Sequence, residues 1–201
     1  MPTSSPAAHR RPAANVAYAG AGLYVTLLAV LHVVQPHMIS DATISKYALG
    51  TAGWMLQCAF VAAGVAYGGV ARQMSVRPAL LSWLTAAAFV VMGIFRIDAV
   101  GPNRIASLHG GMHTGAFFVV AVLAHVLMFA RRSEAKSPAS RMLPYIAPLL
   151  AVTGFVLPGI LGAVIFRAWT LTLVAWVVLT TLETQASTDL DSRLPETPVI
   201  V

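Results

Sequence analysis

The sequence predicts an all-α, polytopic transmembrane helical bundle of about six helices. Of its 201 residues, 58% are hydrophobic and 10% are charged, against about 45–50% and 25% in an average soluble domain. The apolar residues gather in uncharged stretches long enough to cross a bilayer, which takes a helix of ~20 residues. They lack the alternating polarity of barrel strands. The lipid bilayer is therefore the expected main partner, and the plasma membrane the expected location.

Six apolar runs define the predicted helices in chain order: residues 16–34, 49–70, 79–95, 111–129, 145–164 and 168–182. The first run follows a stretch rich in Ala, Pro and Ser, so residues 1–15 are expected to be a disordered cytoplasmic tail. The six-helix domain is expected to cover residues 16–185. Residues 186–201 contain three acids and two prolines with little periodicity, which predicts a second disordered cytoplasmic tail.

Individual positions support these elements in turn. Ser45 suits the N-cap of the second helix. Small residues at four-residue spacing, which let helices approach closely in lipid, occur in the second and fourth runs: Gly64 with Gly68, and Gly111 with Gly115. Pro158 and Gly159 fall inside the fifth run and predict a kink there, because proline removes a backbone donor.

The distribution of Lys and Arg predicts the orientation. Nine lie in the two tails and the second and fourth loops: Arg10, Arg11, Arg72, Arg77, Arg131, Arg132, Lys136, Arg141 and Arg193. Four lie in the other loops: Lys46, Arg96, Arg104 and Arg167. The positive-inside rule then places both termini in the cytoplasm. The basic residues form no stripe with interleaved aromatics, so the net charge of +6 does not indicate nucleic-acid binding.

Polar residues suited to chemistry gather at the predicted outward helix ends: His32, His37, Asp41, Arg96, Asp98, Arg104, His109, His113 and Arg167. Ionisable groups at the membrane boundary are costly, so such a cluster is a functional-site hypothesis. The predicted ligand pocket consists of His32, Ser45, Tyr47, Arg96, Asp98, His109, His113 and Arg167. For Ser45 to act as a nucleophile, a base must lie beside it.

Two histidines in the cluster have metal-ligand spacing. His109 and His113 stand at i and i+4, so on a helix both rings project from one face about 6 Å apart. With His32 as third ligand they would hold zinc, and Asp98 is the candidate catalytic group that orients or deprotonates a bound water. The structural alternative stays open: His109 caps its helix, and Asp98 pairs with an arginine to tie loops together.

Taken in order, these motifs resemble a family of bacterial and archaeal six-helix membrane proteins, domain of unknown function 998 (DUF998). The resemblance is carried by Ile44-Ser45, Tyr47-Ala48, Gly50, Gly53-Trp54, Gly93-Ile94-Phe95, Asp98, His109-Gly110, His113, Arg167, Trp169 and Trp176. The chain departs from the family pattern at Lys46, where an acid is usual, and at Arg96, where proline is common. The resemblance implies a six-helix membrane protein with an outward polar site, and it brings no established reaction.

Three functions stay open at this point. The leading hypothesis is a membrane protein whose outward His/Asp/Arg pocket binds a small molecule or lipid headgroup. The alternative is a metal-dependent membrane hydrolase, and the third is a structural or partner-binding subunit. For a composite site we expect Asp98 to lie within hydrogen-bond or ion-pair reach of His109, His113 or Arg167, because charges at a helix end are unfavourable unless they are paired or hydrated.

Overall fold

The computed structural model describes residues 6–40, 43–99 and 107–191. It contains six α-helices: α1 (Pro6–Val34), α2 (Gly53–Ala71), α3 (Val76–Ile94), α4 (Leu108–Arg131), α5 (Pro138–Val156) and α6 (Gly159–Asp191). Three short 3-10 helices lie between them: η1 (Pro36–Met38), η2 (Ile44–Leu49) and η3 (Arg132–Glu134). The described residues form no strand, and all six α-helices are long and apolar enough to cross a membrane. The predicted all-α bundle is confirmed.

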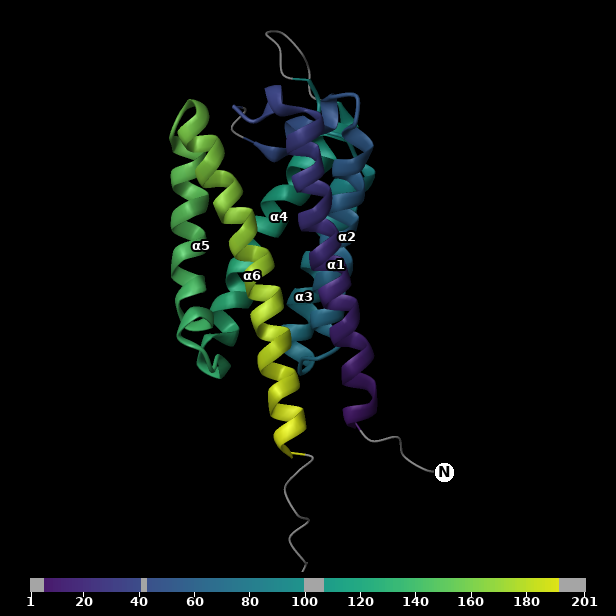
Figure 1. The fold of residues 1–201 in the computed structure, drawn as a ribbon, viewed down its shortest axis with the longest axis vertical. Helices are drawn as coiled ribbons and strands as arrows, with labels where there is room; N and C mark the ends of the chain where they lie inside the picture. The colour runs from purple at the N-terminus through teal and green to yellow at the C-terminus, as the bar shows by residue number, and fades with distance from the viewer. Residues whose placement is uncertain (1–5, 41–42, 100–106, 192–201) are drawn as a thin grey trace, which may run out of the picture.

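The six helices run side by side along the long axis of the molecule (Figure 1). From α1 to α4, each helix packs against the next in the chain, whereas α5 packs mainly against α6. The α5–α6 hairpin joins the rest of the bundle chiefly where α6 crosses onto α1. Helix α1 begins and α6 finishes at one end of the molecule, here called the terminal end, while η1, η2 and the α5–α6 turn lie at the other, the η1–η2 end.

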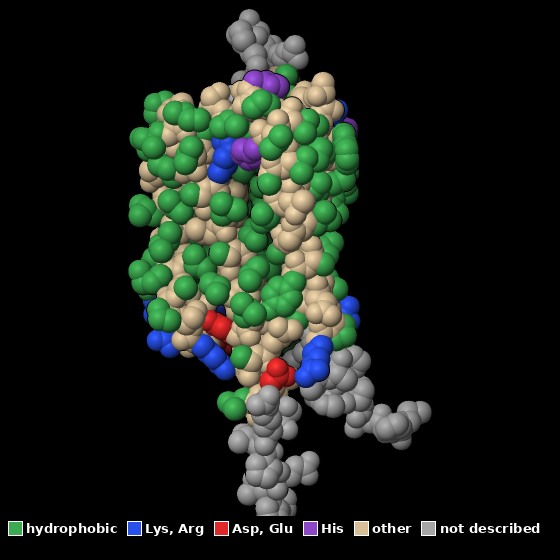
Figure 2. Space-filling view, in the orientation of Figure 1, with side chains coloured by type: hydrophobic (Ala, Val, Ile, Leu, Met, Phe, Trp, Pro, Cys, Tyr) green, Lys and Arg blue, Asp and Glu red, His purple; other side chains and the backbone are tan. Residues whose placement is uncertain are grey.

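Charge follows the same axis. Lys and Arg side chains gather at the terminal end, and the sides of the molecule are mostly hydrophobic (Figure 2). Large apolar side chains are exposed along these sides, among them Leu80, Phe118 and Leu149. An apolar belt between polar ends is the pattern of a bundle whose sides face lipid.

The first and last helices are longer than predicted. Helix α1 begins at Pro6 and α6 continues to Asp191, so both run past the apolar runs that predict them, and the disorder of the two tails stays a prediction. The stretch before residue 16 is rich in alanine, the best helix former, and Ala13 and Ala14 are buried. Packing against the bundle therefore extends helix α1 beyond the apolar run.

The boundary between the last two helices is also displaced. Pro158 and Gly159 form the turn between α5 and α6 instead of a kink within the fifth helix. Gly159 has φ 64°, a left-handed conformation that glycine adopts at little cost. Because α6 starts at Gly159, Arg167 lies inside a membrane-length helix and not in the predicted loop.

Glycines set the spacing of neighbouring helices. A Cβ built on Gly20 of α1 would come within 2.6 Å of the backbone nitrogen of Ala66, and one on Gly64 would come within 2.8 Å of the carbonyl oxygen of Ala86 on α3. The packing role predicted for Gly64 is confirmed. The same prediction for Gly111 and Gly115 is wrong, because a Cβ there would meet nothing within 4 Å.

Candidate functional site

Arg167 is the best-defined charge at the η1–η2 end. It lies about 12 Å along α6 from the start of the helix, at 1.5 Å per residue. Its Nε donates to His32 Nε2 at 2.8 Å, and its two terminal nitrogens donate to the carbonyl oxygens of Ala163, at 2.8 Å, and Met38, at 3.3 Å. Its Cζ lies 5.7 Å from the ring centroid of Tyr47. These contacts hold the guanidinium between α6, α1 and η2.

The imidazole of His32 is neutral in this arrangement. Its Nε2 accepts from Arg167, so the proton is assigned to Nδ1, which donates to the carbonyl oxygen of Leu28 at 2.6 Å. The ring also packs on Tyr47, with centroids 5.2 Å apart. The positive charge of the pair therefore resides on Arg167, and His32 fixes its direction.

Two buried polar side chains lie next to this group. Tyr47 is 0% exposed and Gln35 is 1% exposed. Neither the Tyr47 hydroxyl nor the two amide atoms of Gln35 has a hydrogen-bond partner in the described part of the chain. Leaving such an atom unpaired costs about 1–3 kcal/mol. Both residues are therefore places where a further hydrogen-bonding group is favoured.

Ser45 of η2 and His113 of α4 form a second group. His113 Nε2 lies 2.9 Å from Ser45 Oγ. Its Nδ1 lies 2.8 Å from the carbonyl oxygen of Phe95 and 3.1 Å from that of Met92. Both side chains are buried, and the rings of His113 and Phe60 pack in a T-shaped arrangement with centroids 5.7 Å apart. The predicted N-cap bond of Ser45 to α2 is not formed, because Ser45 belongs to η2 and α2 begins later, at Gly53.

Asp98 is bound at the start of α4. Its carboxylate oxygens accept from the backbone nitrogen of Ser107 at 2.7 Å and from Ser107 Oγ at 2.5 Å. Ser107 is the N-cap of α4 and its Oγ accepts from the Gly110 nitrogen at 3.1 Å. A Cβ on Gly110 would collide with the Asp98 carboxylate. Asp98 thus places a negative charge at a helix N-terminus, where charge of that sign is favourable.

Arg96 and His109 lie at the edge of the site. Arg96 donates to the Ala48 carbonyl oxygen at 3.1 Å, and the exposed His109 packs on the ring of Phe95 with centroids 5.3 Å apart. The contacts of the predicted residues fall into groups: Arg167 with His32 and Tyr47, Ser45 with His113, and Asp98 with Ser107. The single pocket stays a prediction. Asp41 and Arg104, which the sequence places at this end, lie outside the described residues.

The predicted zinc ligands do not come together. Within residues 6–40, 43–99 and 107–191, no three His, Cys, Asp or Glu side chains are close enough to hold a metal ion. His32 and His113 each have hydrogen-bond partners at both ring nitrogens. His109 is exposed, whereas His113 one turn later is 2% exposed. Residues four apart on a helix are offset by about 40° around its axis. On α4 this offset turns His113 toward the bundle and His109 away from it.

A small cavity of about 30 Å³ lies between α1, α2, α3, α4 and α6. Its lining is mostly aliphatic and aromatic, including Phe60, Phe117 and Trp169. Ser45 is among the few polar residues on its wall. The second group therefore borders an apolar interior.

Sequence reasoning missed a polar network at the terminal end. Glu183 on α6 accepts from the backbone nitrogens of Lys136 and Ser137, at 3.1 and 2.9 Å, and from Ser140 Oγ at 2.7 Å. These bonds attach the start of α5 to α6. Ser137 followed by Pro138 is a helix-start signal that marks this position in the sequence.

Two further bonds join α1 to α6 at the same end. Tyr18 donates to Gln185 at 3.0 Å, and Arg11 pairs with Asp189 at 3.2 Å. The second pair is exposed on both sides, where an ion pair contributes little. This network supports a bracing role.

No protein-family model, curated protein or solved structure matches this chain. The resemblance to DUF998 stays a prediction. Six membrane-length helices are compatible with a multi-pass membrane protein, and any finer assignment depends on the side-chain geometry described above.

Proposed function

We propose that this multi-pass membrane protein binds an anionic group, a phosphate or carboxylate, at Arg167 near its η1–η2 end. The group belongs to a lipid headgroup or a small molecule. The observation that carries the proposal is the placement of a half-buried guanidinium inside a membrane-length helix. A charge in that position is costly, and such charges are kept where they serve a site.

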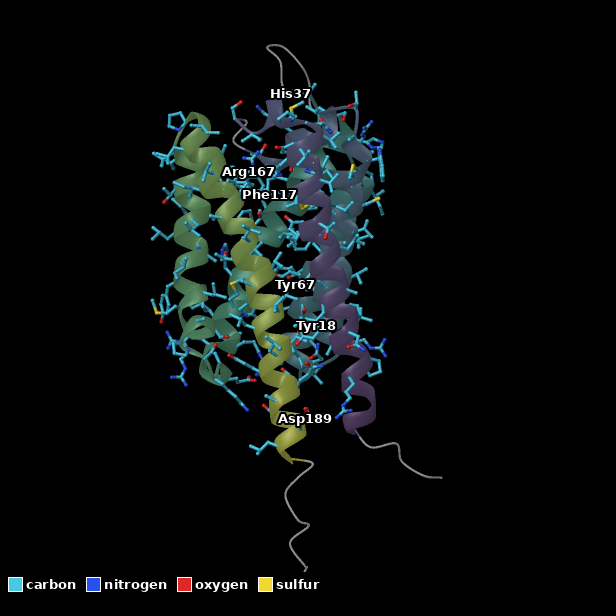
Figure 3. All side chains as sticks on the ribbon, viewed as in Figure 1. Tyr18, His37, Tyr67, Phe117, Arg167 and Asp189 are labelled. Carbon is cyan, nitrogen blue, oxygen red and sulfur yellow. The ribbon has the colours of Figure 1, made fainter. Side chains whose placement is uncertain are left out.

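The surroundings of Arg167 support this proposal. Arg167 lies at the surface between α6 and α1 (Figure 3), where a patch of basic and histidine side chains is surrounded by hydrophobic ones (Figure 2). Its contacts with His32 and Tyr47 fix the plane of the guanidinium. A fixed planar fork of N–H donors suits phosphate and carboxylate oxygens. A lipid headgroup and a small-molecule anion offer the same oxygens to this guanidinium.

The bracing alternative is favoured by a specific bond. Arg167 donates to the Met38 carbonyl oxygen of η1, and so it also ties the connection after α1 to α6. A residue that only braces contributes to stability in the absence of ligand. A residue that binds ligand is needed for ligand-dependent stabilisation, which follows RT ln(1 + [L]/Kd).

Thermal unfolding of the protein in neutral detergent tests the proposal. Four additions are compared: phosphatidylglycerol, phosphatidylcholine, glycerol phosphate and acetate. We expect an anionic addition to raise the Tm of the wild type by several degrees, the size of shift that ~1–2 kcal/mol produces. Stabilisation by phosphatidylglycerol alone identifies a lipid headgroup, and stabilisation also by glycerol phosphate or acetate identifies a small-molecule anion.

Two variants make the outcome specific. Arg167→Gln removes the charge at the site, and Arg72→Gln removes an exposed arginine at the terminal end. The response should disappear in Arg167→Gln and persist in Arg72→Gln. An Arg167→Gln protein with a lowered Tm and a full response to anions would establish the bracing role and refute the binding role.

A further inference from the structure

Ser45 and His113 are brought together from positions 68 residues apart in the chain. Ser45 lies in η2 and His113 lies in the second turn of α4. A distance of 2.9 Å between Ser45 Oγ and His113 Nε2 is within hydrogen-bonding range for a hydroxyl and an imidazole. The fold therefore supplies the base beside Ser45 that the sequence did not reveal.

The partners of the imidazole determine its tautomer. Carbonyl oxygens only accept hydrogen bonds, so the Nδ1 that faces Phe95 and Met92 carries the proton. In the neutral ring, Nε2 then has a free lone pair and accepts the hydrogen of the Ser45 hydroxyl. This is the proton arrangement that a general base needs in order to activate a serine.

The end of α3 orients the base. The last carbonyls of a helix have no partner within the helix and carry partial negative charge. Met92 and Phe95 present these groups to His113 at the end of α3. They hold the ring in place and stabilise positive charge on it when Nε2 takes up a proton. Serine, histidine and an orienting acceptor form the three-part arrangement of an activated nucleophile.

The environment of Ser45 indicates the kind of substrate. Ser45 borders the apolar cavity between α1, α2, α3, α4 and α6. The cavity wall next to it consists mainly of hydrophobic side chains such as Ile44, Phe60 and Met92. An apolar wall suits the hydrocarbon part of an ester and not a charged or sugar-like group, and the empty space of about 30 Å³ admits only a small group beside Ser45.

We propose that Ser45 is a nucleophile activated by His113, and that it transfers the acyl group of an apolar ester to water. Ser45 Oγ attacks the ester carbonyl carbon while its proton moves to His113 Nε2. The bond to the leaving alcohol breaks, and the alcohol takes that proton. Water then attacks the acyl-serine ester, losing its proton to His113, which returns it to Ser45. Ester and water are consumed, and carboxylic acid and alcohol are released.

This activity goes beyond anion binding at Arg167 and does not depend on it. The hydrogen bonds of the two groups involve different residues. The two proposals are read by different measurements, anion-dependent thermal stabilisation for Arg167 and covalent labelling for Ser45, and Arg72→Gln at the terminal end should leave the labelling of Ser45 unchanged. Failure of either proposal is distinguishable from failure of the other.

Covalent labelling of the purified full-length protein tests the assignment. An alkyl fluorophosphonate phosphonylates an activated serine with loss of fluoride, and p-nitrophenyl acetate acetylates it with release of p-nitrophenol. Mass spectrometry of the digested protein should locate the stable phosphonyl group on Ser45, and the acetyl group should be found there in samples quenched with acid before water removes it. Ser45→Ala should abolish them, and His113→Gln should slow labelling about 100-fold or more, the typical contribution of a general base.

Controls separate reactivity from folding. Ser82 is also buried, but its hydroxyl donates to the Tyr67 carbonyl oxygen and has no described base beside it, so Ser82→Ala should label like the wild type. Each variant is compared only if it retains a cooperative thermal transition. Should His113→Gln unfold, Ser45→Cys in a Cys58→Ala background replaces it, and its thiol should react with iodoacetamide faster than exposed Cys58 does in the wild type. Folded wild type without an adduct from either reagent, or labelling that is equally fast in folded His113→Gln, would overturn the assignment.

Discussion

Tyr47 is the residue at which the two groups of the site meet. Its ring lies under the guanidinium of Arg167 and against His32, while Ser45, two residues earlier in η2, contacts His113. Two residues of one short 3-10 helix thus contact an arginine and a histidine from different helices. At the residue scale, the arrangement explains why polar side chains from distant parts of the sequence gather at this end.

Substitution of Asp98 distinguishes a structural role of its carboxylate from a role in ligand binding. Its carboxylate accepts two bonds from Ser107 at the start of α4, so we expect Asp98→Asn to lower the free energy of unfolding by about 1–2 kcal/mol. Asp189→Asn is the control, since it removes one partner of an exposed ion pair and should cost less than ~1 kcal/mol. Thermal unfolding with and without phosphatidylglycerol is the measurement. An Asp98→Asn protein as stable as the wild type that has lost its lipid response would assign Asp98 to the ligand site instead.

At the scale of helices, α1 packs closely against α2, and this contact positions α1, which contains the Arg167 partner His32. The backbones approach where Gly20 faces Ala66 and where Gly69 faces Ala17. Small residues of this kind are the usual contact between helices in lipid, because burial from water supplies no driving force there. Helix α1 ends at Val34, so this contact also sets the position of His32.

The glycines of α1 give a matched pair of substitutions. Gly20→Ala places a Cβ within 2.7 Å of two α2 backbone atoms, whereas Gly22→Ala meets nothing within 4 Å. We expect Gly20→Ala to lower the Tm by several degrees, at a cost of about 1–3 kcal/mol for overpacking. Gly22→Ala should be neutral or stabilising, because alanine favours helix by ~1 kcal/mol over glycine. Equal effects of the two substitutions, measured by thermal unfolding in the same detergent, would contradict the α1–α2 packing.

Sequence patterns predicted the helices better than their ends. Long apolar runs identify membrane-length helices, because an apolar stretch of that length is stable only in a bilayer. Ala13 and Ala14 lie before the first run, and their burial against the bundle, which extends α1, could not be predicted from the run. Pro158 and Gly159 were predicted to kink the fifth helix, and instead they separate α5 from α6, because whether such a pair kinks a helix or ends it depends on how the two halves pack.

The sequence indicated which polar residues lie near this end of the bundle, but it did not indicate which of them contact one another. A histidine or arginine near a helix end is visible in the sequence, whereas the direction of its side chain depends on helix rotation. His109 and His113 illustrate this, since one is exposed and the other is buried on the same helix. The Ser45 to His113 contact joins residues far apart in the chain, so no local pattern predicts it.

For the whole molecule, the two ends differ in their chemistry. The terminal end gathers Lys and Arg (Figure 2) and is braced by Glu183 and its partners. The η1–η2 end contains Arg167 with His32, and Ser45 with His113. If the positive-inside rule holds, the braced end faces the cytoplasm and the candidate site faces outward.

Topology reporters test this orientation. A reporter fused after Val201 should be active only in the cytoplasm, and one inserted near Gly101 should be active only outside, because nine of thirteen Lys and Arg residues lie on the predicted inner side. The activity of paired reporters, one that functions only inside and one only outside, is the readout. The opposite pattern would place the site on the cytoplasmic side.

The most direct test of the central claim is native mass spectrometry of lipid bound to the detergent-solubilised protein. Wild type, Arg167→Gln and Arg72→Gln are each incubated with equal amounts of phosphatidylglycerol and phosphatidylcholine, and bound lipid is counted per protein. Arg167 is half-buried in a membrane-length helix, so a preference for the anionic lipid should be present in wild type and Arg72→Gln and should be lost in Arg167→Gln. Equal binding of the two lipids by the wild type, or an unchanged preference in Arg167→Gln, would contradict a lipid-headgroup site at Arg167; the same comparison with glycerol phosphate then decides whether Arg167 binds any anion.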